Sequence, residues 1–260
     1  MEANWQISDK LEKNTQKFQN HFFKRFNLRE NVSPLTLTSE ITKNYMFPTF
    51  YSDVSCSVGI FLCDFNEAQK IMLAPGISPV KMPHNRSLVI FSAYEYKSVY
   101  NIKPYNEIAM TIPVMANAKF SPPLLPMLLS SYFKKFGYYV FSMPVTSYEN
   151  EIRGHKIWGL PKETQKIVIT QEPNQSHIIT SKAGKKTLDL RIPKAGAIKH
   201  FDVTSPLYSQ KDNRILKSYT SFKGDFNLKK EMRPVFKKTL NPTSYSGYLD
   251  FDPSYYPVLK

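Results

Sequence analysis

The sequence predicts a β-rich α+β fold with a few short helices and an N-terminal helical arm. Segments that alternate apolar and polar residues recur along the chain, as half-buried strands do. The 19 prolines are scattered and divide the chain into short segments. Only a few stretches have the apolar spacing of an amphipathic helix. No internal repeat and no Gly/Ser-rich linker is visible, so we expect one large domain behind the arm.

The arm and the first half of the chain supply most of the predicted helices. Apolar positions among charges over residues 5–29 predict one or two amphipathic helices. Asp64 is expected to cap a short helix that Pro75-Gly76 closes, and the leucine-rich residues 124–136 predict a longer helix. One helical turn is expected before Gly154. Strands are expected over residues 55–63, 87–96, 108–115 and 138–146.

The second half predicts further strands and little helix. Alternation over residues 166–171, 177–182 and 187–193, separated by polar turns, predicts an antiparallel meander. Less regular strands are expected near residues 216–222 and around Phe226. The aromatic residues 247–260 are expected to dock on the body of the domain.

The net charge of +14 raises the question of a nucleic-acid partner. The lysines occur in separated pairs interspersed with acidic residues, and no nucleic-acid-binding motif accompanies them. We therefore interpret the charge as a solvated basic surface that could attract anionic substrates, and expect no nucleic-acid partner. No apolar run reaches the roughly 20 residues of a membrane helix, and residues 1–20 lack the apolar core of a signal peptide. A cytoplasmic protein with no membrane partner is expected.

The cysteines and histidines indicate neither disulfides nor metal. Cys56 and Cys63 fall in one predicted strand, on opposite faces and too far apart to bridge, so both are expected to be reduced. The five histidines are dispersed and lack the paired spacing of a zinc site. We expect no metal.

The stretch Gly154-His155-Lys156-Ile157-Trp158-Gly159-Leu160-Pro161-Lys162-Glu163 holds the main candidate for chemistry. A lysine with its ordinary pKa of about 10.4 is almost wholly protonated at neutral pH and is not a nucleophile. Packing of Trp158, Leu160 and Pro161 around Lys162 would remove water and disfavour the ammonium form. A free amine could then attack a ketone and form a Schiff base. The alternative is a core Trp158 and Leu160, followed by a turn and a solvated Lys162.

This stretch, together with the segment Asn106-Glu107-Ile108-Ala109-Met110-Thr111-Ile112-Pro113-Val114, resembles the acetoacetate decarboxylase family. In that family a carboxylate at the head of a strand and a lysine at the end of a glycine-initiated Pro-Lys segment form the site. The resemblance assigns these catalytic roles to Glu107 and Lys162. It covers residues 45–260, which we take as the domain, and leaves residues 1–44 as the partly helical arm.

The resemblance implies a closed or nearly closed antiparallel barrel, a large homo-oligomer and a reaction without a cofactor. The lysine amine would condense with the ketone of a β-keto acid such as acetoacetate, and the iminium would accept electrons as carbon dioxide leaves. Glu107 would handle the proton delivered to the enamine carbon. Trp158 and Leu160 would line the pocket and exclude water.

Two departures from the family pattern bear on this reading. The family decarboxylases carry a second lysine after the nucleophile, and acetoacetate decarboxylase is the standard case of a lysine activated by a neighbouring cation. Glu163 stands there, so we expect it to face away from Lys162 along an extended segment. Asp53, with Val54 as the nearest alternative, stands where the family has an arginine near the site. The substrate carboxylate would then need Arg86 or Arg153, and we assign substrate binding to Arg153 together with Trp158 and Leu160.

Three functions are compatible with these residues. The first is a carboxy-lyase that decarboxylates a β-keto acid through Lys162. The second keeps the imine but carries out an aldolase or dehydratase reaction on a keto acid. The third is a non-catalytic barrel that binds an anionic partner, which Glu163 and Asp53 favour.

Overall fold

The computed structural model describes residues 1–72, 75–119, 121–229, 235–236, 248–252 and 254–256. Within them, β-strands dominate and helices are few and short, which confirms the predicted β-rich α+β class. No helix in this part of the chain combines the length and the apolar character needed to cross a lipid bilayer.

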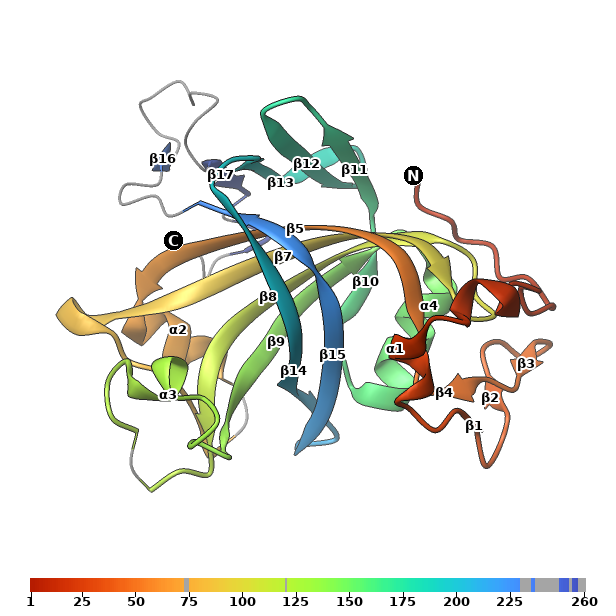
Figure 1. The fold of residues 1–260 in the computed structure, drawn as a ribbon, viewed down its shortest axis with the longest axis horizontal. Coiled ribbons are helices and arrows are strands. Elements are labelled where there is room, and N and C mark those ends of the chain that lie inside the picture. Colours follow the sequence, from red (N-terminus) through yellow and green to blue (C-terminus); the bar gives the residue numbers. More distant parts are fainter. Residues whose placement is uncertain (73–74, 120, 230–234, 237–247, 253, 257–260) are drawn as a thin grey trace.

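The main sheet has eight strands and curls into a half-barrel (Figure 1). Its central path runs in the order β15-β14-β9-β8-β7-β5. The strands on this path are β5 (Tyr51–Asp64), β7 (Arg86–Val99), β8 (Tyr105–Ala116), β9 (Phe136–Val145), β14 (Ala197–Lys211) and β15 (Arg214–Leu228). Two short strands lie beside the path: β6 (Ile77–Pro79) pairs with β8, and β10 (Lys162–Thr164) pairs with β9. The pairings of β9 with β10 and with β14 are parallel, and the rest are antiparallel.

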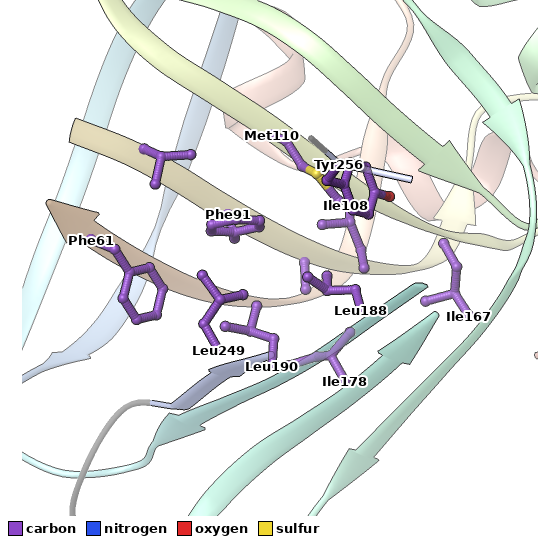
Figure 2. Packing of buried hydrophobic residues seen from close by; sticks show 12 residues of the cluster. Phe61, Phe91, Ile108, Met110, Ile167, Ile178, Leu188, Leu190, Leu249 and Tyr256 are labelled. Atoms are coloured by element: carbon purple, nitrogen blue, oxygen red, sulfur yellow. The ribbon is translucent and has the colours of Figure 1, made fainter. Parts of the chain in front are cut away.

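A five-stranded sheet packs against the first half of the main sheet. Its order is β11-β12-β13-β17-β16, with β11 (Lys166–Gln171), β12 (Gln175–Lys182), β13 (Lys185–Pro193), β17 (Tyr248–Phe251) and β16 (Val235–Phe236). The predicted meander forms its first three strands. The core between the sheets contains apolar residues of both sheets and Tyr256, which follows β17. The sheet residues include Phe61, Phe91, Ile108, Met110, Ile167, Ile178, Leu188, Leu190 and Leu249 (Figure 2). The described part of the aromatic C-terminal segment therefore docks on the body, as predicted.

Two short strand pairs and two short helical turns complete the N-terminal region. Strand β1 (Arg29–Glu30) pairs with β4 (Met46–Phe47), and β2 (Leu35–Thr36) pairs with β3 (Thr42–Lys43). Of the helices predicted over residues 5–29, only η1 (Thr15–Phe18) and α1 (His21–Lys24) form. The one or two amphipathic helices expected there are reduced to these two short pieces, and Phe18 and Phe23 pack in an aromatic cluster with Phe50.

Of the two other helices predicted in the first half of the chain, one forms where expected and one is much shorter. Helix α2 (Phe65–Ile71) begins where expected, since the Asp64 carboxylate accepts hydrogen bonds from the backbone amides of Asn66 and Glu67 at 2.8 and 3.0 Å. The helix predicted over residues 124–136 shrinks to the four residues of α3 (Leu125–Leu128). Leu124 has a φ of +63°, which lies outside helical geometry, and Pro126 lacks an amide donor.

The turn η2 (Pro83–Asn85) precedes β7. Two connected helices lead from β9 to the candidate site. After β9, helix α4 (Tyr148–Arg153) runs directly into a single π-helical turn, η3 (Gly154–Trp158). The chain then reverses at Gly159 and enters β10. Helix α4 forms where one helical turn is expected before Gly154, whereas strand β14 is not among the predicted strands.

Candidate active site

Gly159 sets the direction in which the chain reaches Lys162. Its φ of +59° is left-handed, and a Cβ atom there would lie 2.7 Å from Lys211 Cβ and 2.9 Å from the Gln210 carbonyl oxygen. Only glycine satisfies both constraints. Strand β10 follows, and Lys162 pairs with Met143 of β9. Because side chains alternate along a strand, Lys162 and Thr164 point inward and are buried, whereas Glu163 points outward.

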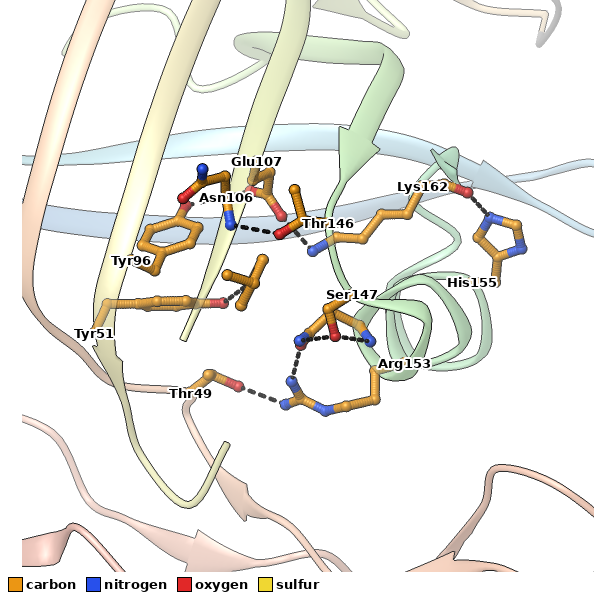
Figure 3. A network of polar contacts seen from close by, with 12 residues as sticks. Thr49, Tyr51, Tyr96, Asn106, Glu107, Thr146, Ser147, Arg153, His155 and Lys162 are labelled. Atoms are coloured by element: carbon orange, nitrogen blue, oxygen red, sulfur yellow. Dashed lines mark hydrogen bonds and ion pairs between the residues drawn. The ribbon is translucent and has the colours of Figure 1, made fainter. Parts of the chain in front are cut away.

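Lys162 and Glu107 form a buried ion pair. The Lys162 Nζ atom lies 2.5 Å from Glu107 Oε2, and their side chains are only 5% and 7% exposed. Glu107 is on β8, whose twelve residues are all buried. The two residues predicted as catalytic therefore meet inside the curled sheet, although 55 residues separate them in the chain (Figure 3).

Tyrosines surround this pair. The Tyr96 hydroxyl donates to Glu107 Oε1 at 3.2 Å, and Lys162 Nζ lies 5.5 Å from the centre of the Tyr105 ring. Tyr51 extends the cluster through a 3.3 Å contact between its hydroxyl and that of Tyr105. Burial, and then neighbouring charges and phenols that include Glu107, hold the pKa of Tyr96 and Tyr105 well above the ordinary value. Both phenols therefore stay neutral and can donate hydrogen bonds.

The stem of Lys162 lies against Gly154. A Cβ atom at Gly154 would lie 2.5 Å from Lys162 Cδ and 2.8 Å from Cγ, so a side chain there would displace the lysine. At the other end of the residue, the Lys162 carbonyl accepts a 2.5 Å hydrogen bond from His155 Nε2. The π-helical turn thus constrains both the side chain and the backbone of Lys162.

Arg153 lies wholly inside the protein. It is 1% exposed, and its guanidinium donates to Asn150 Oδ1 at 2.7 Å and to Thr49 Oγ1 at 3.2 Å. It also lies 4.4 Å from the centre of the Tyr45 ring. Among the described residues no carboxylate forms an ion pair with it, and its buried Nε atom has no hydrogen-bond partner. Figure 3 shows Arg153 and Lys162 extending from the α4–β10 segment toward the strands that carry Tyr96 and Glu107.

Trp158 and Leu160 belong to the hydrophobic cluster beside the ion pair. Leu160 is buried, Trp158 is half-buried, and both share this cluster with Tyr96 and Tyr105. The Trp158 ring lies 5.8 Å from the Phe47 ring and 5.8 Å from the Arg153 guanidinium. The two residues can therefore shield the site from water, as a pocket wall would.

The remaining residues weighed from the sequence lie away from Lys162. Glu163 forms an ion pair with Lys182 and accepts a 2.8 Å hydrogen bond from Gln165 Nε2. Asp53 is exposed and lies 3.7 Å from Lys97. Arg86 is at the opposite end of β7 from Tyr96 and donates to the Leu62 carbonyl at 3.3 Å. Of the two arginines considered for the substrate carboxylate, only Arg153 joins the network in Figure 3.

The tyrosines and Gly154 were not identified from the sequence as site residues. Tyr105 directly precedes Asn106-Glu107, and Tyr94 and Tyr96 alternate on one strand, which is a weak signal of a shared face. The described residues contain no group of three or more His, Cys, Asp or Glu side chains placed to hold a metal ion. A surface hollow of about 810 Å³ lies at the arm beside Asn101, away from Lys162.

The fold and the site together define a class of protein in which a curled β-rich sheet encloses a lysine paired with a carboxylate. The family model for acetoacetate decarboxylase (ADC) matches residues 33–226, and the chain belongs to this family. No curated protein sequence matches it.

Solved structures with a similar fold include two acetoacetate decarboxylases. The enzyme from Legionella pneumophila is 15% identical, with a TM-score of 0.46 over 68% of this chain and 66% of that one. A second acetoacetate decarboxylase is 14% identical, with a TM-score of 0.48 over 62% of this chain and 59% of that one. The chain thus spans just under two thirds of the first and less than two thirds of the second. The enduracididine biosynthesis enzyme MppR, in complex with pyruvate, is 11% identical, with a TM-score of 0.43 over 66% and 76% of the two chains.

Proposed function

We propose that this protein is a Schiff-base-forming lyase that removes the carboxylate of a β-keto acid, such as acetoacetate, as carbon dioxide. The observation that carries the proposal is the buried 2.5 Å contact between Lys162 Nζ and Glu107 Oε2. Burial of both charges lowers what the ion pair adds to stability, so stability is a weak reason for placing these two groups together. Membership of the acetoacetate decarboxylase family supports the same chemistry.

The pair supplies the proton transfer that the reaction needs. When a ketone enters, Glu107 accepts the proton of Lys162, and the neutral amine attacks the carbonyl carbon. Glu107 gives this proton to the departing hydroxyl, so that water leaves and an iminium remains, and the C–C bond to the carboxylate breaks as its electrons move into the iminium. A proton taken up from solvent by Glu107 then adds to the enamine carbon, and hydrolysis releases the ketone and the lysine. Tyr96 fixes Glu107 through its 3.2 Å hydrogen bond, which leaves Oε2 facing Lys162.

Arg153 is the proposed partner of the substrate carboxylate. A buried guanidinium without a carboxylate is costly, and an anionic ligand would supply the missing partner. Trp158 and Leu160 would exclude water around the iminium.

Arg153 also favours a second candidate reaction. A carboxylate held by an arginine is stabilised as an anion, which opposes its conversion to neutral carbon dioxide. A keto acid whose carboxylate stays bound to Arg153 could form the same imine and enamine without losing carbon dioxide. An aldolase or dehydratase reaction would follow from that arrangement.

Reductive trapping tests the shared step. The protein is incubated with acetoacetate or pyruvate and borohydride, and the added mass is located by peptide mapping. We expect the adduct on Lys162 and its loss in Lys162→Ala. Lys166→Ala is the matched control, since Lys166 is exposed on the neighbouring β11. Absence of an adduct with every keto acid tried would rule out the enzymatic proposal.

The fate of the carboxylate separates the two reactions. Release of carbon dioxide from acetoacetate that depends on Lys162 supports the decarboxylase. Exchange of the pyruvate methyl protons with deuterated water, observed by NMR without release of carbon dioxide, supports the aldolase or dehydratase. Arg153→Met should weaken binding of the keto acid in both cases, by roughly tenfold or more, because a charge-assisted contact is lost.

A further inference from the structure

The segment around α3 presents large apolar side chains to solvent. Leu128 is 66% exposed and Tyr132 is 81% exposed, and Leu125 and Leu129 are also exposed. In Figure 1 the segment projects from the end of the half-barrel opposite to the N-terminal strands β1–β4. Single exposed apolar residues are common on proteins, but a cluster on one projecting turn indicates a contact surface.

Lysines lie beside these apolar residues. A hollow of about 370 Å³ is lined by Lys119, Lys134 and Lys135, together with Tyr132 and Phe133. All three lysines are exposed. The Lys135 ammonium lies 2.5 Å from the Asn117 carbonyl oxygen, which holds this lysine at the rim of the hollow. The lysines around this hollow can bind an anionic group, and the exposed apolar side chains beside it can contact a nonpolar phase.

The charge of this surface argues against a self-complementary contact between two copies of the chain. Residues 108–148 include no aspartate or glutamate. A two-fold contact would bring the lysines of one copy against the same lysines of the other, and like charges in contact repel. An anionic bilayer surface offers both the negative charge and the nonpolar interior that these residues match.

We propose that the α3 segment docks the protein on the surface of a membrane that contains anionic phospholipid. Leu128 and Tyr132 enter the interface between headgroups and acyl chains, and Lys119 and Lys134 contact the phosphates. The contact is peripheral and departs from the expectation of no membrane partner, which rested on the lack of a membrane-spanning apolar run. It is independent of the function proposed for Lys162.

Co-sedimentation with vesicles tests the proposal. The full chain is mixed with vesicles of phosphatidylcholine alone or of equal parts phosphatidylcholine and phosphatidylserine. We expect binding to the mixed vesicles that weakens as salt is raised, and little binding to phosphatidylcholine. Lys119→Gln and Lys134→Gln should each weaken binding about fivefold. The double variant Leu128→Ser with Tyr132→Ser should weaken it at least about tenfold, since apolar area no longer leaves water.

The matched control is Ile198→Ser with Lys199→Gln, which removes an exposed apolar residue and an exposed lysine on β14. It should bind as the unchanged protein does. Equal binding to both vesicle types, binding to neither, or unchanged binding of both the lysine variants and the apolar variant overturns the proposal. A dimer seen by sedimentation velocity that the apolar variant abolishes, in protein that binds neither vesicle, assigns the surface to a second copy and also overturns it. The lysine variants remain informative if the apolar variant misfolds.

Discussion

Lys162 is placed by its contacts with a glycine, a histidine and a carboxylate. Its aliphatic stem fills the space that a side chain at Gly154 would take, and its ammonium meets Glu107. The position of the amine therefore depends on Gly154 as well as on its charged partner.

Gly154→Ala tests this placement. The new methyl group would lie 2.5 Å from Lys162 Cδ, so the lysine stem must shift. A displacement of about 1 Å at a reacting group can reduce the rate about 100-fold, and we expect a loss of this order in the rate of borohydride trapping. Gly224→Ala is the control, because a Cβ atom there is 3.7 Å from its nearest neighbour, Phe226. Trapping at the unchanged rate in Gly154→Ala would show that Lys162 does not need this support.

Substitutions at Glu163 test whether Lys162 and residue 163 point to opposite faces of β10. Its carboxylate pairs with Lys182 on the outer face of β10. Glu163→Lys should leave the rate and pH dependence of trapping at Lys162 unchanged within about twofold, because screened charges on the far face act weakly. The loss of stability should stay below about 1 kcal/mol, since the pair is partly exposed. The charge-swapped variant Glu163→Lys with Lys182→Glu is the matched control. A strong acceleration of trapping at neutral pH in both variants would mean that residue 163 acts on the amine.

At the scale of single elements, β10 is the shortest strand of the site and the most consequential. Three residues suffice to turn Lys162 inward and Glu163 outward, as the extended geometry predicted from the sequence requires. The π-helical turn before it could not be predicted, because its hydrogen-bond pattern has no sequence period of its own. Helix α3 is shorter than the sequence predicts. Its leucines have helical spacing, but several of them find no sheet face to cover.

Strand β5 holds two cysteines, and both are free, as predicted. Burial raises the pKa of Cys56 to about 12 and that of Cys63 to about 11. The thiolate is the reactive form, so alkylation by iodoacetamide at pH 8 should be at least about 100-fold slower in the folded protein than in denaturant. Mass spectrometry of the intact protein measures the rates. Fast alkylation of either thiol in the folded state would contradict the buried environment.

The same thiols make stability depend on pH. In the unfolded chain their pKa returns to about 8.5, so the folded state holds more protons between that pH and about 11 to 12. Their contribution to the free energy of unfolding is therefore complete below about pH 8.5 and is lost as pH rises through the folded pKa values. Cys56→Ala with Cys63→Ala should flatten this part of the stability profile in denaturant titrations.

At the scale of the whole molecule, a buried ion pair joins the N-terminal region to the helix that leads to the site. Lys43 Nζ donates to both carboxylate oxygens of Glu149 at 3.0 Å, and the Tyr45 hydroxyl donates to Oε1 at 2.6 Å. Glu149 lies on α4, four residues before Arg153. The boundary predicted between residues 44 and 45 thus crosses a region of close contact, and the division into arm and domain stays a prediction.

Lys43→Ala tests how far the two regions form one folding unit. Glu149 would remain buried with its charge opposed only by a phenol, and we expect a loss of about 3–5 kcal/mol in the free energy of unfolding. Lys103→Ala, at an exposed lysine, is the control and should change it by less than about 0.5 kcal/mol. Urea titration followed by fluorescence measures both. A second unfolding transition, with the main one unchanged, would indicate that the arm unfolds separately.

The amino-acid sequence by itself determined the β-rich class, most of the long strands and the choice of Glu107 and Lys162 as candidates. It could do so because alternation reports on one strand at a time, and because the segments around Glu107 and Lys162 resemble those of a known family. The tertiary structure alone decided that Arg153 is buried without a carboxylate and that Tyr96 and Tyr105 enclose the ion pair. It also left the sheet as an open half-barrel with a projecting apolar turn at α3. These outcomes depend on which faces meet after the sheet curls. Contacts between residues far apart in the chain leave no periodic pattern in the sequence from which they could be predicted.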